Sequence, residues 1–220
     1  MRLVAHRGFA SVNPENTLEA VDSAATVADE IEVDVRRCGS GELVVIHDST
    51  VDRLTDESGA VSEYTRSELG SMSVLGTGEG VPTLSAVLRA IPDDVTINVE
   101  LKESGLAAEA TELLESHHPN AIVSSFSADI LADCRTIDPS VPRAYITDEA
   151  GTEVVETALE LACECLNLNE AVCTEPTIEK AHRTGLHVNA WTIDTRERAE
   201  ALAAAGIDGV IADRPSVRPL

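Results

Sequence analysis

Short hydrophobic segments alternate along the chain with longer segments in which hydrophobic residues recur every three or four positions. The short segments predict strands near residues 2–6, 30–35, 42–46, 95–101, 120–124, 142–146, 164–168, 187–192 and 208–212. The longer ones predict helices near residues 17–28, 83–91, 105–117, 127–136, 152–162, 176–185 and 195–205. Strand–helix alternation with short connections is typical of a parallel sheet, and about eight such units predict a closed (β/α)8 TIM barrel. An open doubly wound sheet is the alternative.

The segment from about residue 48 to residue 80 does not follow this alternation. It contains five glycines and many Ser, Thr and Glu residues. Long irregular segments inside a compact domain are usually functional, for example as a lid. We therefore expect residues 1–220 to form a single α/β barrel domain with a small insertion after its second strand unit. Before that insertion, Asn16 and Glu19 form a capping-box pattern that predicts Asn16 as the N-cap of the first helix.

Polar and charged residues occupy every second position in three of the predicted strands, so they share one face of each strand. These residues are Glu32, Asp34 and Arg36, then Asn98, Glu100 and Lys102, and finally His187, Asn189 and Trp191. A half-exposed antiparallel strand also alternates in this way, but the strand–helix order favours parallel strands that are buried on both faces. We therefore expect these polar faces to point into the barrel.

Three carboxylates on these faces predict a metal site. A buried carboxylate is unfavourable unless it is paired with a cation or binds a metal ion. We therefore predict that Glu32, Asp34 and Glu100 hold one divalent cation. Ligands that are all oxygen favour Mg²⁺, Ca²⁺ or Mn²⁺ over Zn²⁺. The alternative is that the carboxylates form salt bridges to nearby basic residues, namely Lys102, Arg7 or Arg36.

Two histidines lie at the ends of predicted strands: His6 ends the strand at residues 2–6, and His47 ends the hydrophobic run of residues 43–46. The pKa of histidine is close to neutral, so each ring can give or take a proton at physiological pH. Beside the three carboxylates, this pair predicts general acid–base chemistry on a metal-bound phosphate.

Five further residues complete the candidate site. Arg7 and Lys102 have the charge to bind phosphate oxygens, and Glu15 is a candidate to orient Arg7 or His6. Phe126 and Trp191 are two of only five aromatic residues, and both lie near the end of a predicted strand. They are candidates to line an alcohol pocket; the alternative is an ordinary core position, which fits Trp191 equally well and is favoured for Phe126.

The composition limits the partners. Asp and Glu number 39 against 16 Lys and Arg, for a net charge of −23. This charge opposes nucleic acid or an anionic membrane as the main partner, and a small molecule is expected instead. With only Lys102 and Lys180 as lysines, the composition is typical of proteins adapted to molar salt, where self-repulsion is screened.

The first residues form a predicted strand and no apolar run suits a membrane span, so we expect a cytoplasmic location with reduced cysteines and no stable membrane insertion.

Eight segments resemble the glycerophosphodiester phosphodiesterase family. They are His6-Arg7-Gly8, Pro14-Glu15-Asn16-Thr17, Glu32-Val33-Asp34-Val35, Val45-Ile46-His47-Asp48, Asn98-Val99-Glu100-Leu101-Lys102, Ser125-Phe126-Ser127, Trp191-Thr192 and Gly209-Val210-Ile211-Ala212-Asp213-Arg214-Pro215. Each is short, but together they cover nearly the whole chain in the family's order. One departure is Leu54, which follows Arg53 where the family usually has the first threonine of Arg-Thr-Thr.

The resemblance implies a (β/α)8 barrel that cleaves glycerophosphodiesters to glycerol 3-phosphate and an alcohol. It implies a divalent cation on Glu32, Asp34 and Glu100, with His6 and His47 as the acid–base pair. It also implies that Arg7 and Lys102 contact the phosphate. It does not assign the base and the acid to particular histidines.

Three other functions are compatible with a barrel of this kind. A lyase would use the substrate's own hydroxyl and release a cyclic phosphate. A sugar-phosphate isomerase or aldolase would seat phosphate on loops after the last two strands, but the segment from Ile193 to Arg196 there contains no glycine. A binding module that has lost its chemistry is the non-enzymatic alternative, and the intact pair of histidines argues against it.

Overall fold

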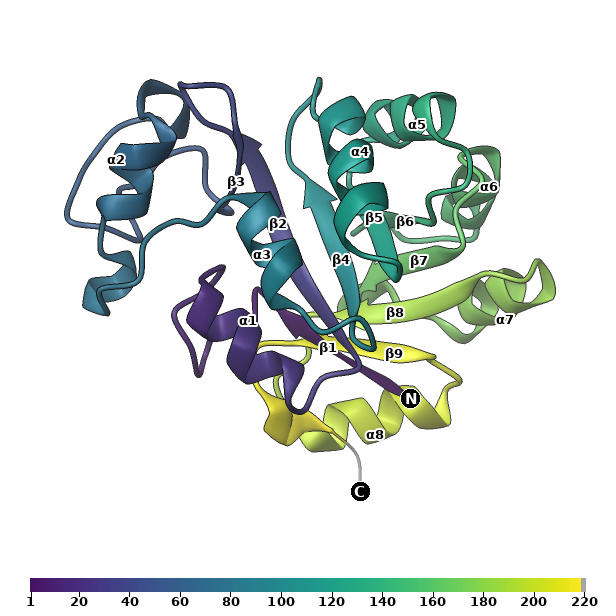
Figure 1. The fold of residues 1–220 in the computed structure, drawn as a ribbon. Coiled ribbons are helices and arrows are strands. Elements are labelled where there is room, and N and C mark those ends of the chain that lie inside the picture. Colours follow the sequence, from purple (N-terminus) through teal and green to yellow (C-terminus); the bar gives the residue numbers. More distant parts are fainter. Residues whose placement is uncertain (219–220) are drawn as a thin grey trace.

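The computed structural model describes residues 1–218, in which eight parallel strands close into a barrel (Figure 1). The barrel strands are β1 (Arg2–His6), β2 (Glu30–Arg37), β4 (Thr96–Leu101), β5 (Ala121–Ser125), β6 (Arg143–Thr147), β7 (Cys165–Asn169), β8 (His187–Trp191) and β9 (Gly209–Ala212). Each strand pairs in parallel with its neighbours, and β1 pairs with both β2 and β9. These pairings close the sheet, so the predicted (β/α)8 barrel is confirmed and the open sheet is excluded.

The strand predicted at 42–46 has a different role from the one expected. It forms β3 (Leu43–Val45), which pairs with β2 in an antiparallel hairpin and is not one of the eight barrel strands. The parallel arrangement expected from strand–helix order is therefore wrong for this strand. The connection from β2 to β3 is too short for the crossover that parallel pairing requires.

Eight α-helices connect the strands of the described chain. They are α1 (Leu18–Ala25), α2 (Arg66–Ser71), α3 (Leu84–Ala90), α4 (Ala107–His117), α5 (Ala128–Ile137), α6 (Glu153–Glu160), α7 (Glu175–Arg183) and α8 (Arg196–Ala204). All except α2 lie where helical periodicity predicted them. The hydrophobic residues of the other seven helices pack against the outer face of the barrel in one continuous core. Within residues 1–218, none of the helices is long and apolar enough to cross a membrane.

The start of α1 differs from the prediction. Its N-cap is Thr17, whose hydroxyl accepts a hydrogen bond from the backbone N–H of Ala20 at 3.2 Å. Asn16 instead has a φ of 60° and donates from its side chain to Asp34 at 2.9 Å. The capping box between Asn16 and Glu19 is therefore wrong, because a tertiary contact occupies the Asn16 side chain.

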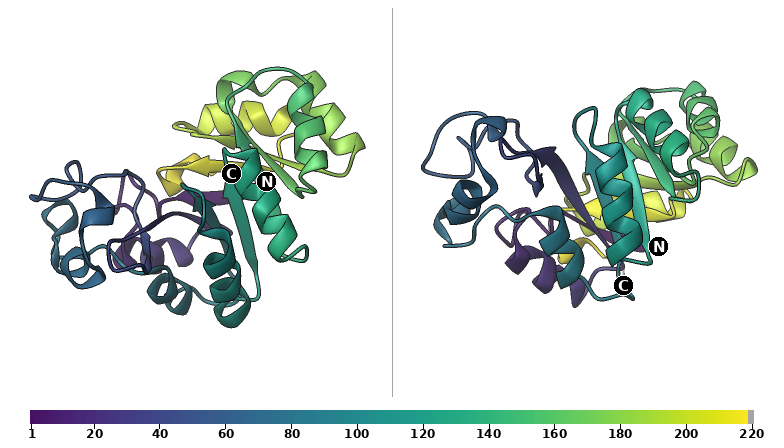
Figure 2. Two further views of the ribbon diagram at one scale, coloured as in Figure 1. Left: turned by 90° about the horizontal axis from the view of Figure 1, so that it is seen from above. Right: turned by 45° about the horizontal axis from the view of Figure 1, so that its top comes forward.

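The segment between β3 and α3 folds on itself to one side of the barrel (Figure 2). It contains α2 and the short 3₁₀ helices η1 (Val61–Glu63) and η2 (Val74–Gly76), and it was predicted only as irregular chain. A second hydrophobic cluster holds it together. The cluster consists of Cys38, Val44, Ile46, Val51, Leu54, Val61, Leu69, Met72, Val74 and Val81. We refer to this cluster as the insertion core. Ile46 belongs to it and immediately precedes His47, so the insertion core supports the backbone next to His47.

Candidate active site

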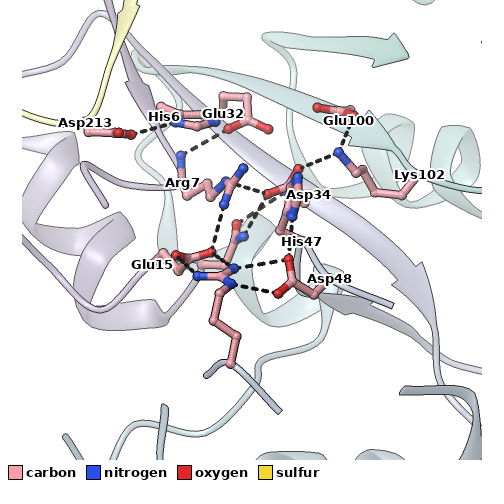
Figure 3. Close-up of polar contacts among 12 residues, drawn as sticks. His6, Arg7, Glu15, Glu32, Asp34, His47, Asp48, Glu100, Lys102 and Asp213 are labelled. Atoms are coloured by element: carbon pink, nitrogen blue, oxygen red, sulfur yellow. Dashed lines mark hydrogen bonds and ion pairs between the residues drawn. The ribbon is translucent and has the colours of Figure 1, made fainter. Parts of the chain in front are cut away.

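Three buried carboxylates, Glu32, Asp34 and Glu100, meet inside the barrel at the carboxyl end of β2 and β4 (Figure 3). We refer to them as the carboxylate trio. Asp34 and Glu100 are partners in the pairing of the two strands, and Glu32 lies two residues before Asp34 on the same face. One oxygen from each lies within 4.8 Å of the others, and all three side chains are buried. The structure therefore brings together the residues that the alternating pattern predicted.

Two basic residues partly neutralise the trio. Lys102 Nζ lies 2.6 Å from Glu100 and 3.4 Å from Asp34, and Arg7 Nε lies 3.2 Å from Asp34. The salt bridges considered as the alternative to a metal site therefore form to Arg7 and Lys102. Arg36 does not join them, because its guanidinium donates to the carbonyl of His47 and pairs with Glu103 (outside the trio).

These ion pairs leave the trio incompletely satisfied. Glu32 has no basic side-chain partner, and its Oε2 accepts only the backbone N–H of Arg7 at 3.0 Å. Glu32 Oε1 and Asp34 Oδ1 are buried and accept no hydrogen bond from residues 1–218, although Lys102 Nζ lies 3.4 Å from Asp34 Oδ1 as an ion-pair partner. Buried polar atoms without a partner are rare. Three converging carboxylates with two such oxygens fit a hard divalent cation, which takes oxygen ligands.

The electrostatics of the trio lead to the same conclusion. Burial and the charge of Asp34 raise the pKa of Glu32 above its usual value, and the same causes raise that of Glu100. For Asp34, the nearby charges of Arg7 and Lys102 outweigh burial and lower the pKa. A divalent cation among the three would remove the repulsion that raises the pKa of Glu32 and Glu100.

His6 ends β1 with its ring held by an aspartate from the far end of the chain. The ring Nδ1 lies 2.6 Å from Asp213 Oδ1. Burial alone would lower the pKa of His6, but the hydrogen bond to Asp213 and the charge of Glu32 raise it above the ordinary value. Nδ1–H donates to the carboxylate, so Nε2 is the ring atom available for proton transfer.

His47 faces the trio from the loop that follows β3. Its Nδ1 lies 2.6 Å from Asp48 Oδ1, and its carbonyl accepts from Arg36 Nε at 2.8 Å. Burial lowers the pKa of His47 below the ordinary value, even though the charge of Asp34 and the hydrogen bond to Asp48 oppose this effect. An aspartate therefore orients each histidine ring. The pKa of His6 is raised from its ordinary value, whereas that of His47 is lowered.

Arg7 lies at the sharp turn between β1 and α1. Its φ is 52°, in the left-handed region, and its side chain reaches both Glu15 at 3.0 Å and Asp34. Gly8 follows with a φ of 74°, and a Cβ there would lie 2.7 Å from the Cβ of Ala20 in α1. Only glycine permits this close approach, which places the Arg7 guanidinium beside the trio.

A pocket of about 150 Å³, open to solvent, lies over Glu32 and Glu100 and is also lined by both histidines, Arg7, Lys102, Phe126 and Trp191. The rings of Phe126 and Trp191 are 5.5 Å apart at an interplanar angle of 80°. Trp191 Nε1 donates to the carbonyl of Asn167, which fixes the indole. Both aromatic side chains therefore line the pocket. No described residue of the insertion after His47 contributes to the lining.

Four residues around the predicted site were not assigned a role in the site from the sequence. They are Asn16, Asp48, Arg53 and Asp213, which hold Asp34, His47, Glu15 and His6 respectively. Asp48 adjoins His47, so its pairing was open to prediction. Asp213 is 207 residues from His6, and only barrel closure between β1 and β9 brings the two together.

The fold and the site together define a TIM-barrel enzyme in which buried carboxylates, two histidines and two basic residues surround one pocket. Residues 6–217 match the glycerophosphoryl diester phosphodiesterase family. The chain is 31% identical to a glycerophosphodiester phosphodiesterase of Caldanaerobacter subterraneus, with 97% of this chain and 94% of that protein covered. The chain therefore belongs to this family, which makes it a phosphoric diester hydrolase and excludes the isomerase and aldolase alternatives.

Solved structures give the same result. A phosphodiesterase of Oleispira antarctica in complex with the product sn-glycerol-3-phosphate has a TM-score of 0.91 and 28% identity, over 98% of this chain and 94% of that one. A glycerophosphodiester phosphodiesterase of Thermotoga maritima has a TM-score of 0.86 and 30% identity, with 99% and 96% covered. The similarity extends over the whole barrel and the insertion.

Proposed function

We propose that this protein hydrolyses glycerophosphodiesters to glycerol 3-phosphate and an alcohol, with one divalent cation bound by the carboxylate trio. One observation carries the proposal: the buried Glu32 lines a pocket between two histidines, each paired with an aspartate, and its Oε1 accepts no hydrogen bond from the described residues. The product bound in the Oleispira relative supports the substrate class. The candidate cations are Mg²⁺, Ca²⁺ and Mn²⁺, since the ligands are all oxygen.

Glu32, Asp34 and Glu100 would hold the cation, which when bound acts as a Lewis acid towards phosphate oxygens. Arg7 and Lys102 lie beside the trio with their charges towards the pocket. In this proposal they bind the remaining phosphate oxygens and hold the diester for attack. Phe126 and Trp191 line the other part of the pocket and exclude water from the alcohol groups.

The surroundings of the two histidines favour His47 as general base and His6 as general acid. Asp213 is the anionic partner of His6 and stabilises its protonated ring. Asp48 is shared between His47 and the Arg53 guanidinium, so its charge is partly neutralised and His47 is more easily neutral. A neutral His47 can take a proton from the attacking hydroxyl or water, and a protonated His6 can donate one to the leaving oxygen.

The test is release of glycerol 3-phosphate from glycerophosphocholine in molar KCl, first with chelator and then with Mg²⁺, Ca²⁺ or Mn²⁺ restored. Release that requires a metal supports the proposal. Release that persists in chelator contradicts the metal site, and no release with any metal contradicts the function. Product analysis separates hydrolysis from a lyase reaction, because only the lyase yields a cyclic phosphate that does not open to glycerol 3-phosphate.

The acidic composition supports a further part of the proposal, that the enzyme works at molar salt inside the cell. At about 0.1 M salt the Debye length is about 10 Å, against about 3 Å at 1 M. Self-repulsion in a chain of net charge −23 is therefore much stronger in dilute buffer. Thermal unfolding should occur at a clearly lower temperature in 0.1 M than in 3 M KCl, and equal midpoints would contradict the salt adaptation.

A further inference from the structure

Arg53 lies outside the pocket, yet it joins the carboxylates that hold two active-site side chains. Its Nη1 and Nη2 donate to the two oxygens of Glu15 at 2.7 and 2.8 Å. Its Nε and Nη2 donate to the two oxygens of Asp48 at 2.7 and 3.2 Å. One planar guanidinium therefore contacts both oxygens of two different carboxylates, a geometry that arginine allows and lysine does not.

Each of these carboxylates has a second partner in the site. Glu15 Oε1 also accepts from Arg7 Nη1 at 3.0 Å, and Asp48 Oδ1 also accepts from His47 Nδ1 at 2.6 Å. The charges alternate in sign from Arg7 through Glu15, Arg53 and Asp48 to His47. Figure 3 labels Arg7, Glu15, Asp48 and His47 and draws their polar contacts as dashed lines.

The backbone around Arg53 is fixed by the insertion. Val51 and Leu54, on either side, are almost completely buried in the insertion core. The backbone N–H of Leu54 also donates to the carbonyl of Val51 at 3.1 Å. Leu54 occupies a position where the resembling family usually has threonine, and here its side chain anchors Arg53 by packing.

We propose that Arg53 is a positioning residue through which the insertion aligns both Arg7 and His47 for reaction. It touches neither the pocket lining nor the carboxylate trio, so it acts through Glu15 and Asp48. The insertion, for which a lid was one expected role, thus supports two active-site side chains through Arg53. This inference rests on the proposed function, because it assigns work to Arg7 and His47.

The experiment compares Arg53→Ala with Arg66→Ala at saturating metal in molar KCl. Arg66 is a matched control, since it is also an insertion arginine with an acidic partner, Glu42 at 3.9 Å, but lies away from the pocket. We expect Arg53→Ala to lower kcat/KM by about 10- to 100-fold, the effect of a misplaced reacting group. Arg66→Ala should stay within about two-fold of the unaltered protein.

Three readouts distinguish positioning from a general structural role. The acidic limb of the pH profile should move to higher pH in Arg53→Ala, because Asp48 loses the positive charge that partly neutralises it beside His47. Arg53→Lys should recover only part of the activity, since a point charge cannot contact both carboxylates with two bonds each. Combining Arg53→Ala with Asp48→Asn should lower kcat/KM by less than the product of the single effects, as expected for residues that act as a unit.

The proposal is overturned if Arg53→Ala stays within two-fold of the unaltered enzyme, if Arg66→Ala loses as much, or if Arg53→Lys is fully active. If Arg53→Ala does not fold, the lysine variant decides by the same criterion. Failure of the proposed function is recognised separately, because the unaltered enzyme would then release no glycerol 3-phosphate with any metal.

Discussion

Both ends of the barrel carry histidine–aspartate pairs, but the surroundings of the pairs differ. At the carboxyl end, His6 pairs with Asp213 at 2.6 Å and His47 pairs with its neighbour Asp48 at the same distance. At the amino end, His182 on α7 pairs with Asp208 at 2.9 Å. Judged by hydrogen bonding alone, the two ends are similar.

The difference lies in what adjoins each pair. His6 and His47 line the pocket beside the carboxylate trio, in which one oxygen of Glu32 and one of Asp34 accept no hydrogen bond from the described residues. His182 is 39% exposed and lines none of the described pockets, and Asp208 also accepts the backbone N–H of Val188 at 2.7 Å. The amino-end pair therefore secures the start of β8. A histidine–aspartate contact indicates chemistry only where unsatisfied buried charge lies beside it.

The largest expected difference between the two ends is in turnover. His6→Ala and His47→Ala should each lower kcat by about 10²–10⁴-fold, because each removes one proton-transfer group. His182→Ala, the matched control, should leave kcat within two-fold. Rates of glycerol 3-phosphate release, with thermal midpoints to verify folding, make the comparison. A folded His6 or His47 variant with near-normal turnover would contradict the assignment of that residue as a proton-transfer group.

The second prediction concerns the metal and compares two buried carboxylates of β2. Divalent cation at about 100 times its Kd should stabilise the protein by about 2.7 kcal/mol, which raises Tm by roughly 5–10 °C for a chain of this size. Glu32→Gln should abolish this rise, because it removes a charged ligand. Glu30→Gln should keep it, since Glu30 is equally buried but lies on the far side of Glu32 from Asp34, nearer Arg2. Scanning calorimetry with and without Mg²⁺ or Mn²⁺ decides, and an undiminished rise in Glu32→Gln contradicts the site.

The third prediction concerns pH. The base must be neutral, so activity rises as pH passes the lowered pKa of His47, below 6.5. The acid must be protonated, so activity falls as pH passes the raised pKa of His6, above 6.5. Asp213→Asn removes a group that raises the pKa of His6 and should move the alkaline limb to lower pH.

The matched change at the amino end, Asp208→Asn, should leave both limbs of the kcat/KM profile in place. Profiles for the three proteins across pH 5–9 test the assignment. An alkaline limb that is unmoved in Asp213→Asn would show that His6 is not the acid.

The smallest effect is expected on stability at the amino end. The Asp208 carboxylate accepts hydrogen bonds from the backbone N–H of Val188 and from His182 Nε2. Asp208→Asn replaces it with a neutral amide and weakens both bonds. Hydrogen bonds to charged groups contribute about 1.5–3 kcal/mol, so the free energy of unfolding should fall by about 1–2 kcal/mol while kcat is unchanged. Urea unfolding in molar KCl measures this loss. If turnover falls while stability is unchanged, the amino-end pair has a catalytic role, which contradicts the comparison.

Much of the fold and the trio was predictable because the signals are local. Period-two alternation placed Glu32, Asp34 and Glu100 on inward faces, and hydrophobic runs located all eight barrel strands. The start of α1 was mispredicted because Asn16 bonds to Asp34, a contact that no local pattern contains. The strand β3 was mistaken for a parallel one because its hydrophobic residues say nothing about its direction.

The sequence by itself determined the strand–helix alternation, the inward carboxylates and the resemblance that the family match bears out. These features depend on neighbours in the chain, where side-chain period and burial are directly linked. Only the tertiary structure decided which partners those side chains meet. Closure of β9 onto β1 places Asp213 on His6, and the core of the insertion places Arg53 between Glu15 and Asp48. Such contacts join residues far apart in the chain, and packing of the whole barrel and insertion is what brings them within hydrogen-bonding distance.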